Sequence, residues 1–162
     1  MKTEFTTFDV IKILKTDRER LRVWINEGFV VPSIQKATGP GTKHLFSRED
    51  VYRIEFFRKL CAAGISRSEA ARMANDIKAG YLQKHSDIPI PTEPNYYVIY
   101  RKLKVDKKGE YIWETEQYFF GRIDETRKGE VFAMIEMFNY DFVYIINFAK
   151  IIKDVDASIS NL

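Results

Sequence analysis

The sequence predicts an α+β fold, with short helices in its first half and a small antiparallel β-sheet followed by a terminal helix in its second half. Apolar residues recur at helical spacing between N-cap signals up to about residue 79. Strand-like runs flank a turn at residues 106–109. Between the halves, Pro89, Pro91 and Pro94 exclude helix. We therefore expect two domains, residues 1–80 and residues 95–162.

The composition is that of a globular protein and excludes several classes of function. The 162 residues are 45% apolar and 14% aromatic, enough for a buried core. No apolar run approaches the ~20 residues of a membrane span, and the N-terminus lacks the apolar core of a signal peptide, so we expect a cytoplasmic protein without membrane contact. Cys61 is the single cysteine and His44 and His85 lie far apart, so we expect no metal site.

Catalysis is not expected either. The chain shows no glycine-rich phosphate loop, no nucleophile elbow and no paired His/Asp constellation. We expect no catalytic residue and no cofactor.

Charge is divided unevenly along the chain. Residues 1–80 contain 15 Lys and Arg against 10 Asp and Glu, whereas residues 81–162 contain 11 against 13. The first half therefore carries a net +5 and the second half a net −2, although the total is only +3. A basic region of this kind is the candidate for contact with a polyanion such as nucleic acid.

The first predicted helix begins at Thr6 or Thr7 and has Asp9 as a capping-box partner. Its apolar positions at helical spacing are Phe8, Val10, Ile11, Ile13 and Leu14. We expect it to be a supporting helix.

The second predicted helix is capped by Thr16 or Asp17 and ends at Gly28, which suits the C′ position. Its apolar face comprises Leu21, Trp24 and Ile25, and its other positions include Arg18, Arg20, Arg22 and Asn26. A short helix with three arginines near its N-terminus is suited to reading bases in a major groove. The alternative is that Arg18, Arg20 and Arg22 form an ordinary solvated face.

A basic loop follows, and it favours the first interpretation. Residues 35–44 hold Gly39-Pro40-Gly41 at the tip of a predicted hairpin. Lys36 lies on one side of the tip, and Lys43 and His44 lie on the other. Basic residues at such a tip are expected where a wing follows the phosphate backbone. Taken alone, His44 is better interpreted as a plain surface histidine.

Two further helices complete the first half. Ser47 is the predicted N-cap of one, with Asp50 as its N3 partner, and Gly64 ends it. Ser66 lies in a turn before the next helix, which we expect to cover residues 69 to about 79. Cys61 is expected to be a buried small hydrophobe.

These residues together resemble the DNA-binding domain of the MerR (mercury-resistance regulator) family of bacterial transcription regulators, a winged helix-turn-helix. The matching pieces within residues 5–75 are Leu21-Arg22-x-Trp24 with Gly28-Phe29, Phe46-Ser47 with Asp50-Val51, and Leu60 with Gly64-Ile65-Ser66. The resemblance implies that Arg22 contacts the DNA backbone from the recognition helix. It implies the same for Lys43 or His44 from the wing.

The resemblance also implies partners and an assembly. It implies a sequence-specific regulator that binds double-stranded DNA as a homodimer on an inverted repeat, with RNA polymerase and an unidentified small-molecule effector as further candidate partners. Two departures stand out: Lys15 occupies the place of the family's usual Gly between the first two helices, and the family's long pairing helix is not evident. The dimer contact must therefore be built differently.

The second half is expected to form strands over residues 96–105, 111–120 and 131–138, with a further extended segment at 142–146. Residues 106–109 join the first two strands as a hairpin turn. In the second strand, strict alternation predicts one face with Tyr111, Trp113, Thr115, Gln117 and Phe119. Asn147 is the predicted N-cap of a final helix that closes the sheet, with the apolar stripe Ile151, Ile152, Val155 and Ile159.

Two interpretations of this aromatic half remain. In one, aromatic side chains with Glu114, Glu116 or Glu136 form a cage for a lipophilic cation, and the domain is a sensor. In the other, which we favour, Tyr and Phe fill a core and a subunit interface, and the domain serves dimerisation.

Two other functions would suit the first half. An excisionase-like or architectural DNA-binding factor would bind at recombination junctions instead of promoters. A protein-interaction module of the chaperone-modulator type would use a similar fold without DNA, and salt-sensitive DNA binding would separate it from the others.

Overall fold

The computed structural model describes residues 2–77, 95–122 and 125–162, and the side chains of all of these except residues 95, 116–122 and 125–127. The proline-rich crossover that the sequence predicts lies outside the described residues. Contacts divide the chain into two units. The N-terminal unit holds the described residues up to 77 together with residues 151–162, and the sheet unit holds the described residues from 95 to 150. The α+β prediction is confirmed.

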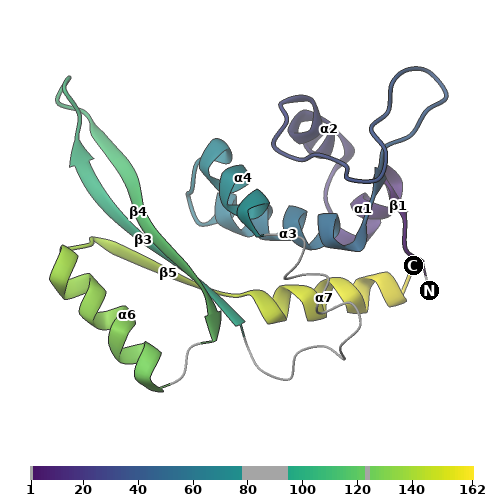
Figure 1. The fold of residues 1–162 in the computed structure, drawn as a ribbon. Coiled ribbons are helices and arrows are strands. Elements are labelled where there is room, and N and C mark those ends of the chain that lie inside the picture. The colour runs from purple at the N-terminus through teal and green to yellow at the C-terminus, as the bar shows by residue number, and fades with distance from the viewer. Residues whose placement is uncertain (1, 78–94, 123–124) are drawn as a thin grey trace. The chain divides into compact units, whose positions relative to one another are not determined.

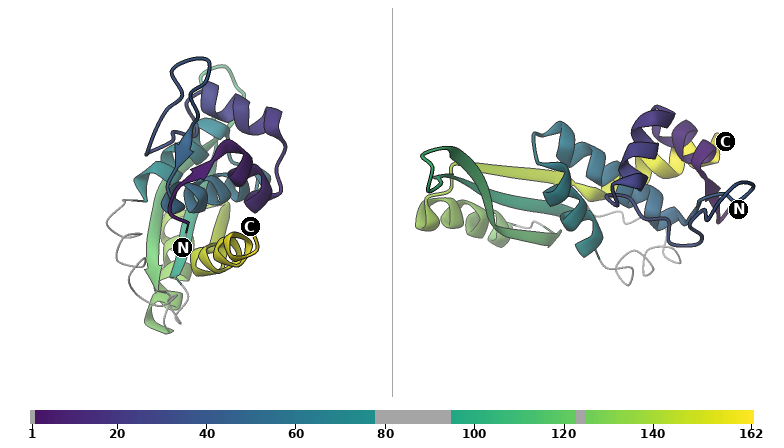
Figure 2. Two further views of the ribbon diagram at one scale, coloured as in Figure 1. Left: turned by 90° about the vertical axis from the view of Figure 1, so that its right-hand side faces the viewer. Right: turned by 90° about the horizontal axis from the view of Figure 1, so that it is seen from above.

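The N-terminal unit is helical, with one very short pair of strands (Figure 1). Its elements are β1 (Phe5–Thr6), α1 (Thr7–Leu14), α2 (Arg18–Asn26), β2 (Leu45–Phe46), α3 (Arg48–Ala62) and α4 (Arg67–Asp76). β1 pairs antiparallel with β2. The loop before β2, residues 36–44, stands clear of the helices in the views of Figures 1 and 2, and we call it the wing.

Local capping sets the helix boundaries, as the sequence predicts. Thr6 and Asp9 form a capping box at α1, and Ser47 and Asp50 form another at α3. Asp17 caps α2 through a hydrogen bond from the Arg20 amide. Helix α4 begins at Arg67, two residues earlier than expected, because Ser66 supplies its N-cap.

Aromatic residues from distant parts of the sequence form the core of this unit. Phe5 and Phe46 are paired across β1 and β2 and are fully buried. Phe57 of α3 is buried against the edge of the Trp24 ring of α2, with ring centroids 5.1 Å apart, and it stacks on Phe29 at 6.1 Å. These contacts fix α2 on α3.

The terminal helix α7 (Phe148–Ser160) has its first turn in the sheet unit and the rest in the N-terminal unit. The predicted N-cap is confirmed, because the Lys150 amide donates to the side chain of Asn147. The predicted apolar stripe of α7 is buried throughout. Tyr52 of α3 donates a hydrogen bond of 2.6 Å to Asp156, which also lies 3.4 Å from Arg48. By these contacts residues 151–162 pack with α3, whereas the sequence led us to expect that they close the sheet.

The sheet unit contains β3 (Asn95–Val105), β4 (Tyr111–Arg122), α6 (Glu125–Phe138) and β5 (Phe142–Asn147). The strand order is β4-β3-β5, and both pairings are antiparallel. Helix α6 covers one face, where its residues pack on the sheet core of Val98, Tyr100, Val131 and Tyr140. β5 pairs only with residues 96–101 of β3, so the hairpin of β3 and β4 continues beyond it as a two-stranded ribbon (Figure 1).

Two expectations for this unit are wrong. Residues 131–138 are helix, not strand, and belong to α6. Apolar residues lie on all sides of this helix, so its sequence has no clear helical period and reads equally well as a buried strand. In β4, the register shifts between the pairs Tyr100–Gln117 and Arg101–Thr115. This irregularity ends the strict alternation predicted for the strand; the side chains of Gln117 and Phe119 lie outside those described.

Candidate nucleic-acid interface

Helix α2 presents one row of polar side chains beside its buried face. Leu21, Trp24 and Ile25 are buried, whereas Arg18, Arg22 and Asn26 are exposed. The three exposed residues are four apart, so they lie along one side of the helix. Asp17 caps the end from which this row begins.

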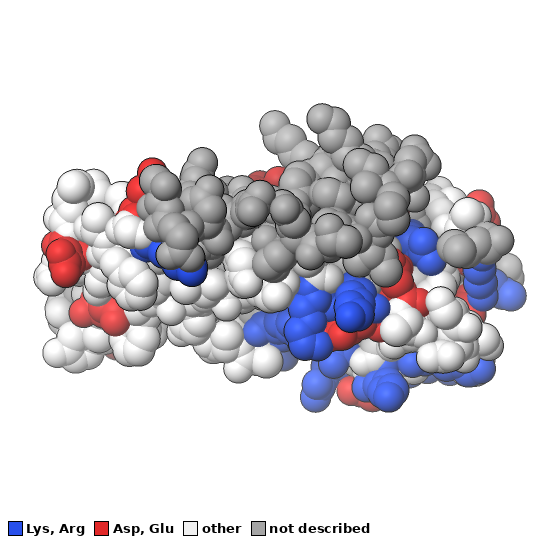
Figure 3. Space-filling model, turned by 90° about the horizontal axis from the view of Figure 1, so that it is seen from below, with Lys and Arg blue, Asp and Glu red and all other residues white. Residues whose placement is uncertain are grey.

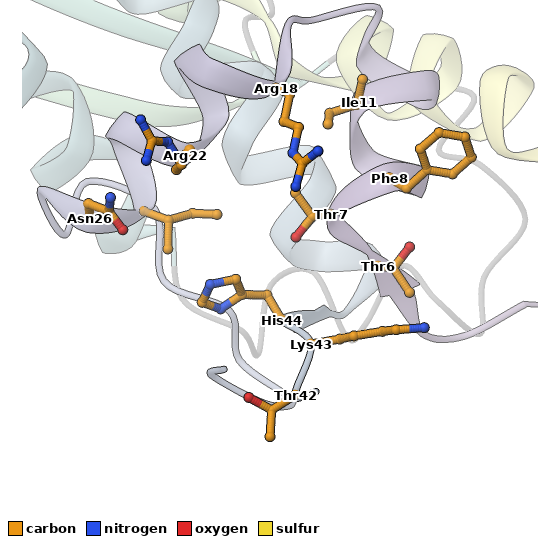
Figure 4. A pocket seen from close by; sticks show the side chains of 11 residues that line it. Thr6, Thr7, Phe8, Ile11, Arg18, Arg22, Asn26, Thr42, Lys43 and His44 are labelled. Atoms are coloured by element: carbon orange, nitrogen blue, oxygen red, sulfur yellow. The ribbon is translucent and has the colours of Figure 1, made fainter. Parts of the chain in front are cut away.

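The row lines a hollow of about 510 Å³ between α1, α2 and the wing. Figure 4 shows Arg18, Arg22 and Asn26 on the α2 side, with Thr42, Lys43 and His44 on the wing. Thr6, Thr7, Phe8 and Ile11 line it from the start of α1. Of the six predicted contact residues, the structure therefore brings four together: Arg18, Arg22, Lys43 and His44.

The remaining two predicted residues lie outside this hollow. Arg20 points to another side of α2 and lines a second hollow with Arg58 and Arg67. Lys36 lies on the other arm of the wing, close enough to His44 to influence its charge.

The wing is held at its base by backbone hydrogen bonds and at its tip by one hydroxyl group. At the base, Gln35 and Leu45 form an antiparallel bridge. At the tip, the Thr42 hydroxyl accepts from the amides of Thr38 and Gly39 and donates to the Gly39 carbonyl. Gly41 has φ of 85°, a conformation that side chains disfavour. The tip therefore has a defined shape.

A buried carboxylate connects the base of the wing to α3. Asp50 accepts hydrogen bonds from the Ser33 amide at 2.9 Å, the Ser33 hydroxyl at 2.7 Å and the Ser47 amide at 3.0 Å. Arg53 contacts its other oxygen at 3.1 Å. Sequence analysis identified Asp50 only as a helix cap, and its contact with Ser33, 17 residues earlier, had no sequence signal.

The cations around the hollow differ in their pairing. Arg22 forms an ion pair of 2.7 Å with Glu19, and Arg20 approaches Asp17 at 3.4 Å. Within the part of the chain that the structure describes, Arg18 and Lys43 have no ion pair. Both are exposed. Either cation can therefore bind an anion without first giving up an ion pair.

His44 contributes a neutral ring to the hollow. Its Nδ1 accepts a hydrogen bond of 3.1 Å from the Ala37 amide, which leaves Nε2 as the protonated nitrogen. Partial burial and the nearby charge of Lys36 both lower the pKa of His44. The side chain is thus a polar donor at neutral pH instead of a cation.

Sequence analysis missed several residues of this site. Phe8 was expected in the apolar face of α1, but its side chain is 63% exposed and lines the hollow, with Lys12 4.7 Å from its ring centroid. Asn26 was noted only as a polar position. The spacing of Arg18, Arg22 and Asn26 at every fourth residue was the signal that could have separated this row from Arg20.

The surface charges agree with the uneven distribution along the sequence. On the face drawn in Figure 3, most of the visible Lys and Arg lie over the N-terminal unit and few lie over the sheet unit. In the described ranges, no helix combines the length and the apolar character needed to cross a membrane.

The carboxylates of the predicted cation cage do not converge in the described part of the sheet unit. Glu114 is paired with Lys104 on the ribbon, and Glu136 is exposed on α6. The side chain of Glu116 lies outside those described. Tyr100 and Tyr140 are buried in the core, with ring centroids 5.1 Å apart. These contacts favour the packing interpretation for these two tyrosines.

Comparison with known proteins identifies the N-terminal unit. The model of the MerR HTH family regulatory protein matches residues 5–77. No curated protein matches the chain. Members of this family act by binding DNA and not by catalysis. The match extends from β1 to the end of α4 and includes every element around the hollow. Residues 5–77 are therefore a MerR-type HTH DNA-binding regulatory domain.

Proposed function

We propose that this chain is a sequence-specific transcriptional regulator that binds an inverted repeat in double-stranded DNA as a homodimer. One observation carries the proposal: the row on α2 and the wing flank the same hollow, with Arg18 and Lys43 unpaired among the described residues on its two sides. A helix and a wing arranged in this way can hold a base edge and a neighbouring phosphate at the same time.

In this proposal the row on α2 reads the major groove. Arg18 and Arg22 suit the O6 and N7 atoms of guanine, and Asn26 suits the N6 and N7 atoms of adenine. The Arg22–Glu19 pair is exposed, so exchanging Glu19 for a phosphate or a base costs at most about 1 kcal/mol. Arg22 can therefore also make the backbone contact that the family resemblance implies.

The helix assignment is tested by comparing Arg18→Ala with Arg20→Ala. The two arginines lie on the same exposed helix, but only Arg18 lines the hollow. Arg18→Ala should weaken binding to the preferred sequence by ~1–3 kcal/mol and relax the preference at one base pair. Arg20→Ala should have a smaller effect, without a change in preference. Fluorescence anisotropy with a selected duplex and its single-base variants measures both.

Equal losses for the two variants, in proteins that are folded by circular dichroism, would contradict this orientation of α2. Loss of binding without a change in base preference for Arg18→Ala would assign Arg18 to the phosphate backbone instead.

In the wing, we propose that Lys43 carries the electrostatic contact and that His44 mainly positions the loop. Lys43→Ala should reduce the slope of log affinity against log salt by about one unit, because one phosphate contact is lost. His44→Gln should leave that slope unchanged, because the ring is neutral and its Nδ1 is occupied by Ala37. A slope that depends on His44 but not on Lys43 would reverse these roles.

The rest of the proposal concerns the DNA target and the regulatory partners. Genome-wide mapping of bound sites should find inverted repeats within promoters, with half-sites about one helical turn apart. Sites at recombination junctions would indicate the excisionase-like alternative, and absence of salt-sensitive DNA binding would indicate the protein-interaction module. RNA polymerase and a small-molecule effector are the further partners that co-purification and ligand screening would address.

A further inference from the structure

The ribbon of the sheet unit has one apolar face and one polar face. Directly paired residues of neighbouring strands lie on the same face. Leu103 pairs with Trp113, and Val105 pairs with Tyr111. Phe142 pairs with Arg101 and therefore joins the same face. The opposite face carries Lys102, Lys104, Ile112 and Glu114.

The apolar side chains of the first face are exposed. Tyr111 is 75% exposed, Val105 59%, Phe142 52%, Trp113 41% and Leu103 37%. We call these five residues the ribbon face. They are contiguous: the ring centroids of Trp113 and Phe142 are 5.0 Å apart, and the Arg101 guanidinium lies 5.2 Å from the Trp113 ring.

The ribbon face is comparable in area to the largest apolar patches on monomeric proteins, which are often functional. Aromatic side chains bury about 150–250 Å² each when enclosed, so the exposed parts of Tyr111, Trp113 and Phe142 amount to roughly 300 Å². Leu103 and Val105 extend the patch to roughly 450 Å², the middle of the roughly 300–600 Å² range of the largest patches on monomers. A standard interface covers ~800 Å² on each partner, so the ribbon face would supply its apolar centre and the surrounding residues its polar rim.

We propose that the ribbon face is the interface between two copies of this chain, packed face to face about a two-fold axis. This inference rests on the proposed function, because a regulator of paired half-sites needs a two-fold contact. Besides the aromatic sheet, the second half of the chain has one other extended apolar surface, the stripe of the terminal helix α7. The stripe of α7, including Ile151 and Val155, is buried within the chain, so it is not available for contact with a second copy.

Charge also favours a second copy as the partner. Arg101 is the one charged residue on this face among the described strand residues, and it is buried beneath Trp113 and Phe142. Two such faces meet without like charges opposite each other, and their aromatic rings can interleave as in packed sheets. The polar face with Lys102, Lys104 and Glu114 stays in solvent.

The test introduces a lysine on each face of the same strand. Tyr111→Lys places a charge in the proposed interface, and Ile112→Lys, the next residue, places the same charge on the opposite, polar face. Sedimentation equilibrium of the full chain without DNA should show a dimer at micromolar concentration. Tyr111→Lys should raise the dimer dissociation constant by about 100-fold or more, because the two-fold axis brings two added charges into one apolar interface. Ile112→Lys should change it by less than about threefold.

A monomeric wild-type chain, an unaffected dimer in Tyr111→Lys, or equal weakening by both lysines would each overturn the proposal. Val105→Lys provides a second variant on the ribbon face if Tyr111→Lys does not fold. A duplex with a single half-site separates this inference from the proposed function. Tyr111→Lys should bind that duplex as the wild type does, whereas a wild-type chain that binds no DNA but dimerises through the ribbon face would refute the proposed function alone.

Discussion

The two units use their apolar residues in opposite ways. In the N-terminal unit, large side chains such as Phe46, Phe56 and Phe57 are fully buried, and the exposed row of α2 is polar, although Phe8 on α1 stays exposed. In the sheet unit, Trp113 and Phe142 remain substantially exposed beside a buried core. A unit that buries its apolar surface can offer charge and hydrogen bonds to a polyanion. A unit that leaves apolar surface exposed is suited to contact with another protein surface.

The largest expected contrast comes from removing one phenylalanine in each unit. Phe57→Ala should lower the free energy of unfolding by about 3–5 kcal/mol, because Phe57 is fully buried and holds both Trp24 and Phe29. Phe142→Ala should lower the free energy of unfolding of the monomer by less, about 1–2 kcal/mol, since only about half of its side chain is buried. Urea denaturation at submicromolar concentration measures both.

The same pair of variants should respond in the reverse order in an association assay. Phe142→Ala should weaken the dimer in sedimentation experiments, although its fold is intact. If Phe142→Ala instead unfolds as readily as Phe57→Ala, the contrast between the two units fails.

An intermediate effect is expected where α7 meets α3. Burial, followed by the hydrogen bond to Asp156, raises the pKa of Tyr52 far above its ordinary value. The stabilisation is therefore fully present below a pH of about 10, the pKa of an unfolded tyrosine, and is lost as the pH rises above it. Tyr52→Phe should lower the free energy of unfolding at pH 7 by about 1 kcal/mol and should reduce its alkaline decline.

Asp156→Ala is the matched variant for this contact. It leaves the buried Tyr52 hydroxyl without this acceptor, so it should cost about 1–3 kcal/mol, more than Tyr52→Phe. Thermal unfolding of the wild type and both variants between pH 7 and pH 11 tests these expectations. A plot of stability against pH for Tyr52→Phe that runs parallel to that of the wild type would refute the assignment of the alkaline decline to Tyr52.

The smallest expected effect concerns two left-handed residues, one in each unit. Lys15 ends α1 with φ of 49°, and Asn139 follows α6 with φ of 52°. Lys15→Gly should raise the free energy of unfolding by up to about 1 kcal/mol, because glycine adopts this conformation without a steric penalty. Asn139→Gly should gain less, since asparagine tolerates it better. Denaturation midpoints measured side by side test this order.

Local signals were enough to predict the N-terminal unit. Thr6 and Ser47 cap helices through partners three residues away, so the sequence contains both partners of each contact. Lys15 has a left-handed conformation, which glycine adopts without a steric penalty. Four of the six predicted contact residues surround the hollow because the helix and the wing were predicted at the right residues.

The errors arose where tertiary contacts decide the outcome. The segment from Val131 to Phe138 has an apolar pattern that suits a strand or a helix, and only packing on Tyr100 and its neighbours selects the helix. The register shift opposite Arg101 depends on strand pairing, which alternation alone does not reveal. Arg20 lies on another side of α2 than Arg18 and Arg22, and its predicted contact with DNA stays a prediction.

The position of Asp50 has a consequence for how such a domain can diversify. This carboxylate joins the start of α3 to Ser33, just before the wing, so the attachment points of the wing are independent of what its tip contains. Residues 36–43 can then be replaced, lengthened or given other charges while the rest of the N-terminal unit stays unchanged. Evolution or an engineer could therefore adjust how strongly this domain holds the phosphate backbone by grafting a foreign wing between two fixed anchors, without altering the helix that reads the bases.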